Sequence, residues 1–109
     1  MNGRPLDLSM SIERIAVLGA GQMGNGITQV AACAGYEVTM IDIQQDYVDN
    51  GMANIRKSLQ KIVSKERMTE EEAASALSRI SGSVHRSSAA DVDLVVEAIP
   101  EIPELKFST

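Results

Sequence analysis

The residues with the clearest chemical meaning are glycines near the start of the chain. Residues 19–24 read GAGQMG, which is the spacing G-x-G-x-x-G. The spacing alone is a weak signal, because glycines also gather in ordinary loops. Here it follows a short apolar run at 15–18 and opens a helical pattern, a context typical of loops that bind the phosphates of a dinucleotide. The residues predicted to bind such a cofactor are Gly19, Ala20, Gly21, Gln22, Met23 and Gly24.

Each glycine of this loop has a separate expected role. Gly19 permits a tight turn out of the strand, and Gly21 lacks a Cβ atom that would keep a pyrophosphate away from the backbone. Gly24 allows the following helix to pack closely on the strand. The free N–H groups and the positive dipole end at the N-terminus of that helix then favour phosphate binding.

An acidic residue completes the pattern. Asp42 stands 23 positions after Gly19, directly after the apolar, β-branched stretch 38–41. A carboxylate at the end of a second strand accepts hydrogen bonds from ribose hydroxyls and repels a 2′-phosphate, so it favours NAD over NADP. The alternative is that Asp42 only caps the next element and that the glycines form a structural turn. We favour the cofactor site because strand, spacing, helix and acid agree with one another.

Alternating strands and helices must position these residues. Apolar runs predict buried strands at 15–18, 38–41 and 92–99, with a weaker signal at 80–85. Helical spacing predicts helices from the glycine loop to Gly35, from about Gln44 to Glu66, and from Thr69 to Gly82. In the third helix, Thr69 and Glu72 fit a capping box, and Ile80 falls on the apolar stripe. The order predicts an α/β fold, a Rossmann-type parallel sheet with flanking helices, over residues 12–109 after a flexible leader at 1–11.

Composition limits the other classes of function. The 109 residues have room for one domain, 3% of them are aromatic, and the formal net charge is −5. An acidic chain with few stacking side chains is a poor binder of nucleic acid. No apolar run is long enough to span a membrane. With one cysteine and one histidine, an internal disulfide and a zinc site are excluded, and we expect a cytoplasmic protein without a metal.

Three segments resemble a known family. Residues 15–27 (IAVLGAGQMGNGI), 29–32 (QVAA) and 93–101 (DLVVEAIPE) are similar to the opening part of 3-hydroxyacyl-CoA dehydrogenases, including the 3-hydroxybutyryl-CoA type. The first segment is shared with related dehydrogenases, and its combination with the last segment is much more specific. The resemblance implies an NAD-dependent oxidoreductase that interconverts the hydroxyl of a 3-hydroxyacyl-CoA and a ketone by hydride transfer.

The resemblance also implies further binding residues. Glu101 and Lys106 match residues of the family's cofactor site, and Ser58 and Lys65 match a serine and a lysine that contact the CoA portion of the substrate. Positions 58 and 65 are two helical turns apart and therefore share a face. For Ser58 and Lys65 the alternative is a solvated helix face. The chain departs from the family at Ile102-Pro103, where relatives usually continue into a helix.

The catalytic histidine, its glutamate and the substrate-binding serine and asparagine of the family follow the fourth strand. The sequence therefore predicts no catalytic residue in this chain, which we expect to be inactive alone, and His85 is interpreted as a surface histidine. Full-length relatives are expected to form homodimers, and the final strand is expected to expose an edge that favours association. Two alternatives remain open: a gulonate-type or 3-hydroxyisobutyrate-type dehydrogenase, and a non-catalytic nucleotide-binding module.

Overall fold

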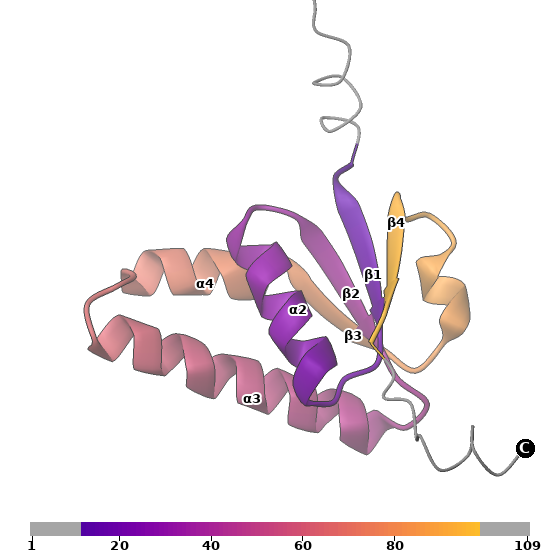
Figure 1. The fold of residues 1–109 in the computed structure, drawn as a ribbon, viewed down its shortest axis with the longest axis horizontal. Helices are drawn as coiled ribbons and strands as arrows, with labels where there is room; N and C mark the ends of the chain where they lie inside the picture. The colour runs from indigo at the N-terminus through magenta and orange to yellow at the C-terminus, as the bar shows by residue number, and fades with distance from the viewer. Residues whose placement is uncertain (1–11, 99–109) are drawn as a thin grey trace, which may run out of the picture.

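The computed structural model describes residues 12–98, which form a parallel four-stranded sheet with helices packed on it (Figure 1). The predicted Rossmann-type α/β fold is confirmed. The predicted leader at 1–11 and the candidate residues Glu101 and Lys106 lie outside the described residues. The elements are β1 (Arg14–Leu18), α2 (Gln22–Cys33), β2 (Glu37–Ile41), α3 (Gln45–Ser64), α4 (Glu70–Ser78), β3 (Ile80–Ser83), the 3₁₀ helix η1 (Arg86–Ala89) and β4 (Leu94–Glu97).

The strands stand in the order β3-β2-β1-β4. The chain therefore builds outward from β1 through β2 to β3, and then returns to place β4 on the other side of β1. The β1–β2 register runs from Arg14↔Glu37 to Leu18↔Ile41, and the β1–β4 register runs from Ile15↔Leu94 to Leu18↔Glu97. The order reverses between β1 and β4, and open α/β sheets bind ligands beyond the carboxyl ends of the strands at such a point.

The two faces of the sheet are covered unequally. Figure 1 shows α2, α3 and α4 on one side of the sheet and the short η1 connection on the other. Side chains alternate along β1 accordingly: Ile15 and Val17 belong to the large apolar cluster with the helices, whereas Ala16 and Leu18 belong to a small cluster on the opposite face. The main core therefore lies between the sheet and the three helices.

Backbone hydrogen bonds explain where the first helix stops. Gly35 adopts a left-handed conformation with φ +105°, and its N–H donates to the carbonyl of Ala32 at 3.1 Å. The N–H of Tyr36 donates to the carbonyl of Ala31 at 3.1 Å, which completes a Schellman motif. The prediction that Gly35 ends this helix is confirmed.

The third helix begins as predicted and ends earlier than predicted. The Thr69 hydroxyl accepts from the N–H of Glu72, and the Glu72 carboxylate accepts from the N–H of Thr69, so the capping box is confirmed. The placement of Ile80 and Gly82 in this helix was wrong, because α4 ends at Ser78. The weaker strand signal at 80–85 is confirmed, because both residues belong to β3. Pairing with β2 decides their conformation, since Ile80 aligns with Val38 and is 8% exposed.

The fourth strand is shorter and more exposed than predicted. Within the described residues it spans Leu94–Glu97, whereas the prediction began at residue 92, and Leu94 and Val95 are 43% and 47% exposed. The prediction of a buried strand was wrong within the described residues because β4 pairs there with β1 alone and forms an edge of the sheet. An apolar run indicates a strand that can be covered on both faces, but it does not reveal which neighbours are present.

Candidate functional site

The glycine loop begins where β1 ends, at the carboxyl edge of the sheet. Gly19 has φ +118°, a left-handed conformation that glycine adopts without a steric penalty. Its N–H donates to the carbonyl of Ile41 at 2.6 Å, which fixes the start of the loop to the end of β2. The loop therefore turns sharply at the edge where the sheet order reverses.

Gly24 and Gly21 differ in the space around them. A Cβ atom on Gly24 would overlap the carbonyl group of Gly19, so α2 can pack this closely on the loop only with glycine there. A Cβ atom on Gly21 would meet nothing within 4 Å. Gly24 thus has the close-packing role expected for the third glycine, and the backbone at Gly21 faces open space.

The N-terminus of α2 is left without side-chain compensation. Gly21 is its N-cap residue and supplies no side-chain hydrogen bond, and the first turn contains no acidic residue. In contrast, the first turn of α3 contains Asp46, and α4 begins with three glutamates. The positive end of the α2 dipole and its free N–H groups are therefore available to an anion such as a phosphate.

Asp42 joins the second strand to the glycine loop. Its Oδ2 accepts a hydrogen bond from the N–H of Ala20 at 2.8 Å, and its Oδ1 accepts from the N–H of Ile43 at 2.7 Å. The side chain is half-buried. A carboxylate has about four acceptor positions, so each oxygen retains one for a hydroxyl group of a ligand. The structure thus brings Asp42 and the glycine loop together, as the sequence predicted.

A small hollow lies beside Asp42. Its volume is about 170 Å³, and its walls come from the ends of β1 and β2 and from the segment that follows β3. Most of its walls are apolar, with the Asp42 carboxylate and the Arg86 guanidinium as the charged groups. The lining residues are Leu18, Gly19, Ile41, Asp42, Ile43, Val84 and Arg86.

Two residues that pack around Ala20 were not predicted from the sequence. Asn25 of α2 is 8% exposed, and its Nδ2 donates to the carbonyl of Ala20 at 3.4 Å. Gly51 of α3 lies so close that a Cβ atom there would sit 2.8 Å from the same carbonyl oxygen. An amide side chain between two glycines of a loop–helix motif was a usable signal for Asn25. Nothing local marked Gly51, because it lies 31 positions from Ala20 in the sequence.

The two candidate CoA-binding residues do not share one hollow. Ser58 is half-buried and helps line a hollow of about 730 Å³ along α3, together with Lys57 and Lys61. Lys65 is exposed, caps the C-terminus of α3, and does not line this hollow. Lys65 directly follows Ser64, the last residue of α3, and its N–H still donates to the carbonyl of Lys61 at 3.1 Å, so the helical spacing between positions 58 and 65 reaches to the end of the helix.

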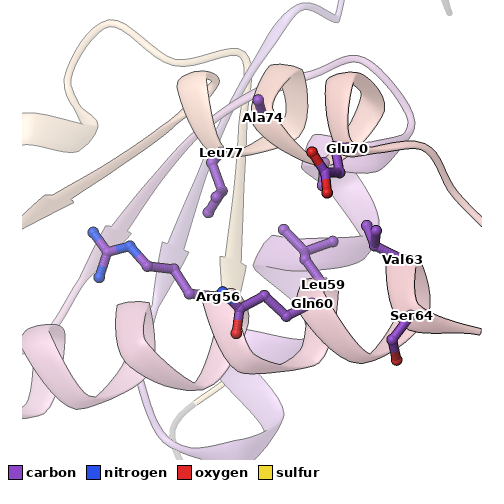
Figure 2. Close-up of a pocket in the computed structure, with 9 residues that line it drawn as sticks. Arg56, Leu59, Gln60, Val63, Ser64, Glu70, Ala74 and Leu77 are labelled. Carbon is purple, nitrogen blue, oxygen red and sulfur yellow. The ribbon is translucent and has the colours of Figure 1, made fainter.

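A groove between α3 and α4 is separate from the cofactor loop. Figure 2 shows Leu59 of α3 and Leu77 of α4 pointing into the gap between the two helices. Its volume is about 480 Å³, and neither the glycine loop nor Asp42 contributes to its walls. The groove is mostly apolar, and Arg56 and Glu70 are the charged residues of its walls.

The remaining polar residues of the described part add no catalytic centre. His85 is exposed, as expected, and lies between Val84 and Arg86, which line the hollow beside Asp42. Residues 12–98 contain no cluster of histidine, cysteine, aspartate or glutamate that could hold a metal ion. Within the same residues, no helix is both long enough and apolar enough to cross a membrane.

The fold and the loop define a dinucleotide-binding domain of the Rossmann class. The family model described as "3-hydroxyacyl-CoA dehydrogenase, NAD binding domain" matches residues 14–109, and the chain belongs to this family. The predicted family and the predicted cofactor, NAD, are thereby confirmed.

Named relatives agree with this family. The chain is 46% identical over 95 residues to a 3-hydroxybutyryl-CoA dehydrogenase of Bradyrhizobium diazoefficiens, covering 87% of this chain and 32% of the relative. It is 42% identical over 92 residues to a probable 3-hydroxybutyryl-CoA dehydrogenase of Bacillus subtilis, covering 84% and 32% of the two chains. The crystal structure of (S)-3-hydroxybutyryl-CoA dehydrogenase from Ralstonia eutropha superposes with a TM-score of 0.82 at 41% identity, covering 89% and 34%. The chain thus spans about a third of the length of these relatives.

Proposed function

We propose that this chain is the NAD-binding part of an enzyme that interconverts 3-hydroxyacyl-CoA and 3-oxoacyl-CoA by hydride transfer. The observation that carries the proposal is the glycine loop at the reversal of strand order, held by the carboxylate of Asp42 through the N–H of Ala20 at 2.8 Å. The names of the relatives support the substrate class, because several of them are 3-hydroxybutyryl-CoA dehydrogenases.

Each part of NAD has a place in this proposal. The pyrophosphate lies over Gly21 at the N-terminus of α2, where open space and free N–H groups favour it. Asp42 accepts hydrogen bonds from the adenosine ribose and repels the 2′-phosphate of NADP. The adenine ring occupies the hollow of about 170 Å³ beside Asp42. Bound NAD would supply the hydride acceptor. Glu101 and Lys106 are proposed to complete the cofactor site.

The acyl-CoA is proposed to lie along α3. Ser58 and Lys65 are the proposed contacts, and the lysines at 57 and 61 add positive charge near Ser58. CoA carries several phosphates, so a cationic helix surface attracts it. Ser58 follows the start of α3 by 13 residues, which places it about 20 Å along the helix axis.

Turnover is proposed to require more than this chain. His85, the single histidine of the sequence, stands between two residues that line the hollow beside Asp42, where the adenine ring is proposed to bind, and not at the proposed nicotinamide half of the site. Without a general base next to the substrate hydroxyl, the reaction loses a factor of about 100 to 10,000 in rate. We further propose a cytoplasmic protein whose full-length form is a homodimer.

Calorimetric titration with NAD and with NADP tests the proposed site. We expect the chain to bind NAD at least about tenfold more tightly than NADP, and we expect Asp42→Ala to weaken NAD binding by about tenfold or more, since it removes the ribose acceptor and the bond to Ala20. Asp49→Ala is the matched control, because Asp49 is exposed on α3. Equal affinities for the two nucleotides, or an Asp42→Ala variant that binds like the control, would contradict the proposal.

A further inference from the structure

Residues from three places, the end of β2, α2 and α3, approach the backbone of Ala20 in the cofactor loop. Its N–H donates to Asp42 at the end of β2, and its carbonyl accepts from Asn25 of α2 at 3.4 Å. The residue is 2% exposed. The Ala20 carbonyl and the N–H of Gly21, over which the pyrophosphate is proposed to bind, belong to one peptide group, so a shift of this group changes the direction of the Gly21 N–H.

The helix α3 reaches the same peptide group through Gly51. A Cβ atom on Gly51 would lie 2.8 Å from the Ala20 oxygen and 3.1 Å from the Ala20 Cβ. The same Cβ atom would lie 2.9 Å from the Cε of Met40, and this overlap costs little free energy because that atom ends a flexible side chain. The contact with Ala20 is costly, because the Ala20 backbone is held on both sides, through its N–H by Asp42 and through its carbonyl by Asn25.

When a side chain at position 51 is added, we expect the loop at Ala20 to move rather than α3. Gly51 is flanked on the same face of α3 by Val48 and Ile55, which are 2% and 0% exposed. Helix α3 is therefore anchored in the core on both sides of Gly51, one turn before it and one turn after it. The loop, in contrast, lies outside the regular elements, and Ala20 is the residue by which it contacts the main apolar cluster.

We propose that Gly51 and Asn25 are positioning residues for NAD, and that they act through the peptide group of Ala20. Neither residue needs to touch the cofactor. Because position 51 carries no side chain, α3 can pack directly against the loop at Ala20. The Asn25 amide fixes the direction of the Ala20 carbonyl. This inference rests on the proposed function, because it concerns how the same NAD site is shaped.

The test compares three variants of the 109-residue chain by NAD calorimetry and by thermal unfolding. We expect Gly51→Ala to weaken NAD binding about tenfold, as overpacking displaces the loop. The same substitution at Gly26 is the matched control, because a Cβ atom there meets nothing within 4 Å, and its NAD affinity should be unchanged. Asn25→Ala should weaken binding about threefold, because one weak hydrogen bond is lost.

The NAD dissociation constant and the unfolding temperature together distinguish a positioning role from a purely structural one. A structural role alone lowers the unfolding temperature and leaves the dissociation constant of the folded protein unchanged, and that result for Gly51→Ala and Asn25→Ala would overturn the inference. If Gly51→Ala does not fold, the NAD dissociation constant of folded Asn25→Ala tests the inference in the same way. A wild-type chain that does not bind NAD would overturn the proposed function and this inference together, whereas normal binding by wild type and both variants overturns the inference alone.

Discussion

At the scale of single residues, the glycines of one motif have different structural roles. Gly19 is needed for its left-handed backbone, and Gly24 is needed because α2 touches the Gly19 carbonyl. Gly21 has neither constraint: its φ is −69°, and the space around it is open. Only a ligand that approaches Gly21 closely would make a side chain there unfavourable.

Three alanine substitutions distinguish these roles. Gly21→Ala should leave the free energy of unfolding nearly unchanged and weaken NAD binding by about tenfold or more, since its Cβ projects toward the proposed pyrophosphate. Gly24→Ala should destabilise the fold by about 1–3 kcal/mol, because backbone atoms must shift. Gly26→Ala should stabilise α2 by up to about 1 kcal/mol. Urea unfolding and calorimetry measure the two quantities, and equal effects at Gly21 and Gly26 would contradict the assigned roles.

Residue types and local spacing were sufficient to predict the glycine loop and Asp42, because the motif is continuous and the acid stands at the end of the next strand. Asn25 and Gly51 were not predicted. Their importance comes from the approach of α2 and α3 to one peptide group, and this approach depends on how distant segments pack. A sequence pattern records which residues are apolar, but it does not record which backbone atoms come within 3 Å of one another.

At the scale of elements, the third strand shows how pairing overrides a local pattern. Ala73, Ala76, Leu77 and Ile80 follow helical spacing, yet the helix ends before Ile80. The segment Ile80–Ser83 becomes a strand because β2 offers it hydrogen-bonding partners, with Ile41 aligned to Ser83. Gly82 fits this position because a Cβ atom there would lie 2.5 Å from the side chain of Val48. The preference of a four-residue segment is weak, and tertiary pairing decides it.

The first and fourth strands are joined by a carboxylate at their starting ends. Asp93 Oδ2 accepts hydrogen bonds from the N–H groups of Glu13 at 2.8 Å and Arg14 at 3.0 Å. The hydrogen bond from Glu13 and then the one from Arg14 are the main reasons why the pKa of the Asp93 carboxyl lies below its usual range. The same contact fixes the position at which β4 begins to pair with β1.

This pKa shift predicts how the contribution of Asp93 to stability changes with pH. Because the folded-state pKa is below the unfolded-state pKa, the contribution is fully present above the unfolded value and is lost as the pH falls through the folded value. We expect Asp93→Asn to destabilise the chain at pH 7, and we expect the difference from wild type to shrink below about pH 4. Urea unfolding at pH 7 and pH 3 measures this, with Asp91→Asn as the control. A difference that stays constant with pH would contradict the role of the ionised carboxylate.

At the scale of the whole molecule, the order of the strands explains where a dinucleotide fits. The adenosine half is proposed to lie toward β2, where Asp42 stands, and the other half is proposed to extend toward β4. Helices α2 and α3, which contact the loop, lie on one face of the sheet (Figure 1). The named relatives are about three times as long as this chain, and their additional length leaves room for the substrate-binding and catalytic parts of the proposed enzyme.

The central claim is that NAD binds at the glycine loop beside Asp42, and an NMR titration of backbone amides with NAD tests it most directly. We predict saturable shifts of the amide signals of Gly21, Gly24 and Ile43, with none at Glu71 in the first turn of α4. Shifts confined to the groove between α3 and α4, or no shift in the loop at saturating NAD, would contradict the claim.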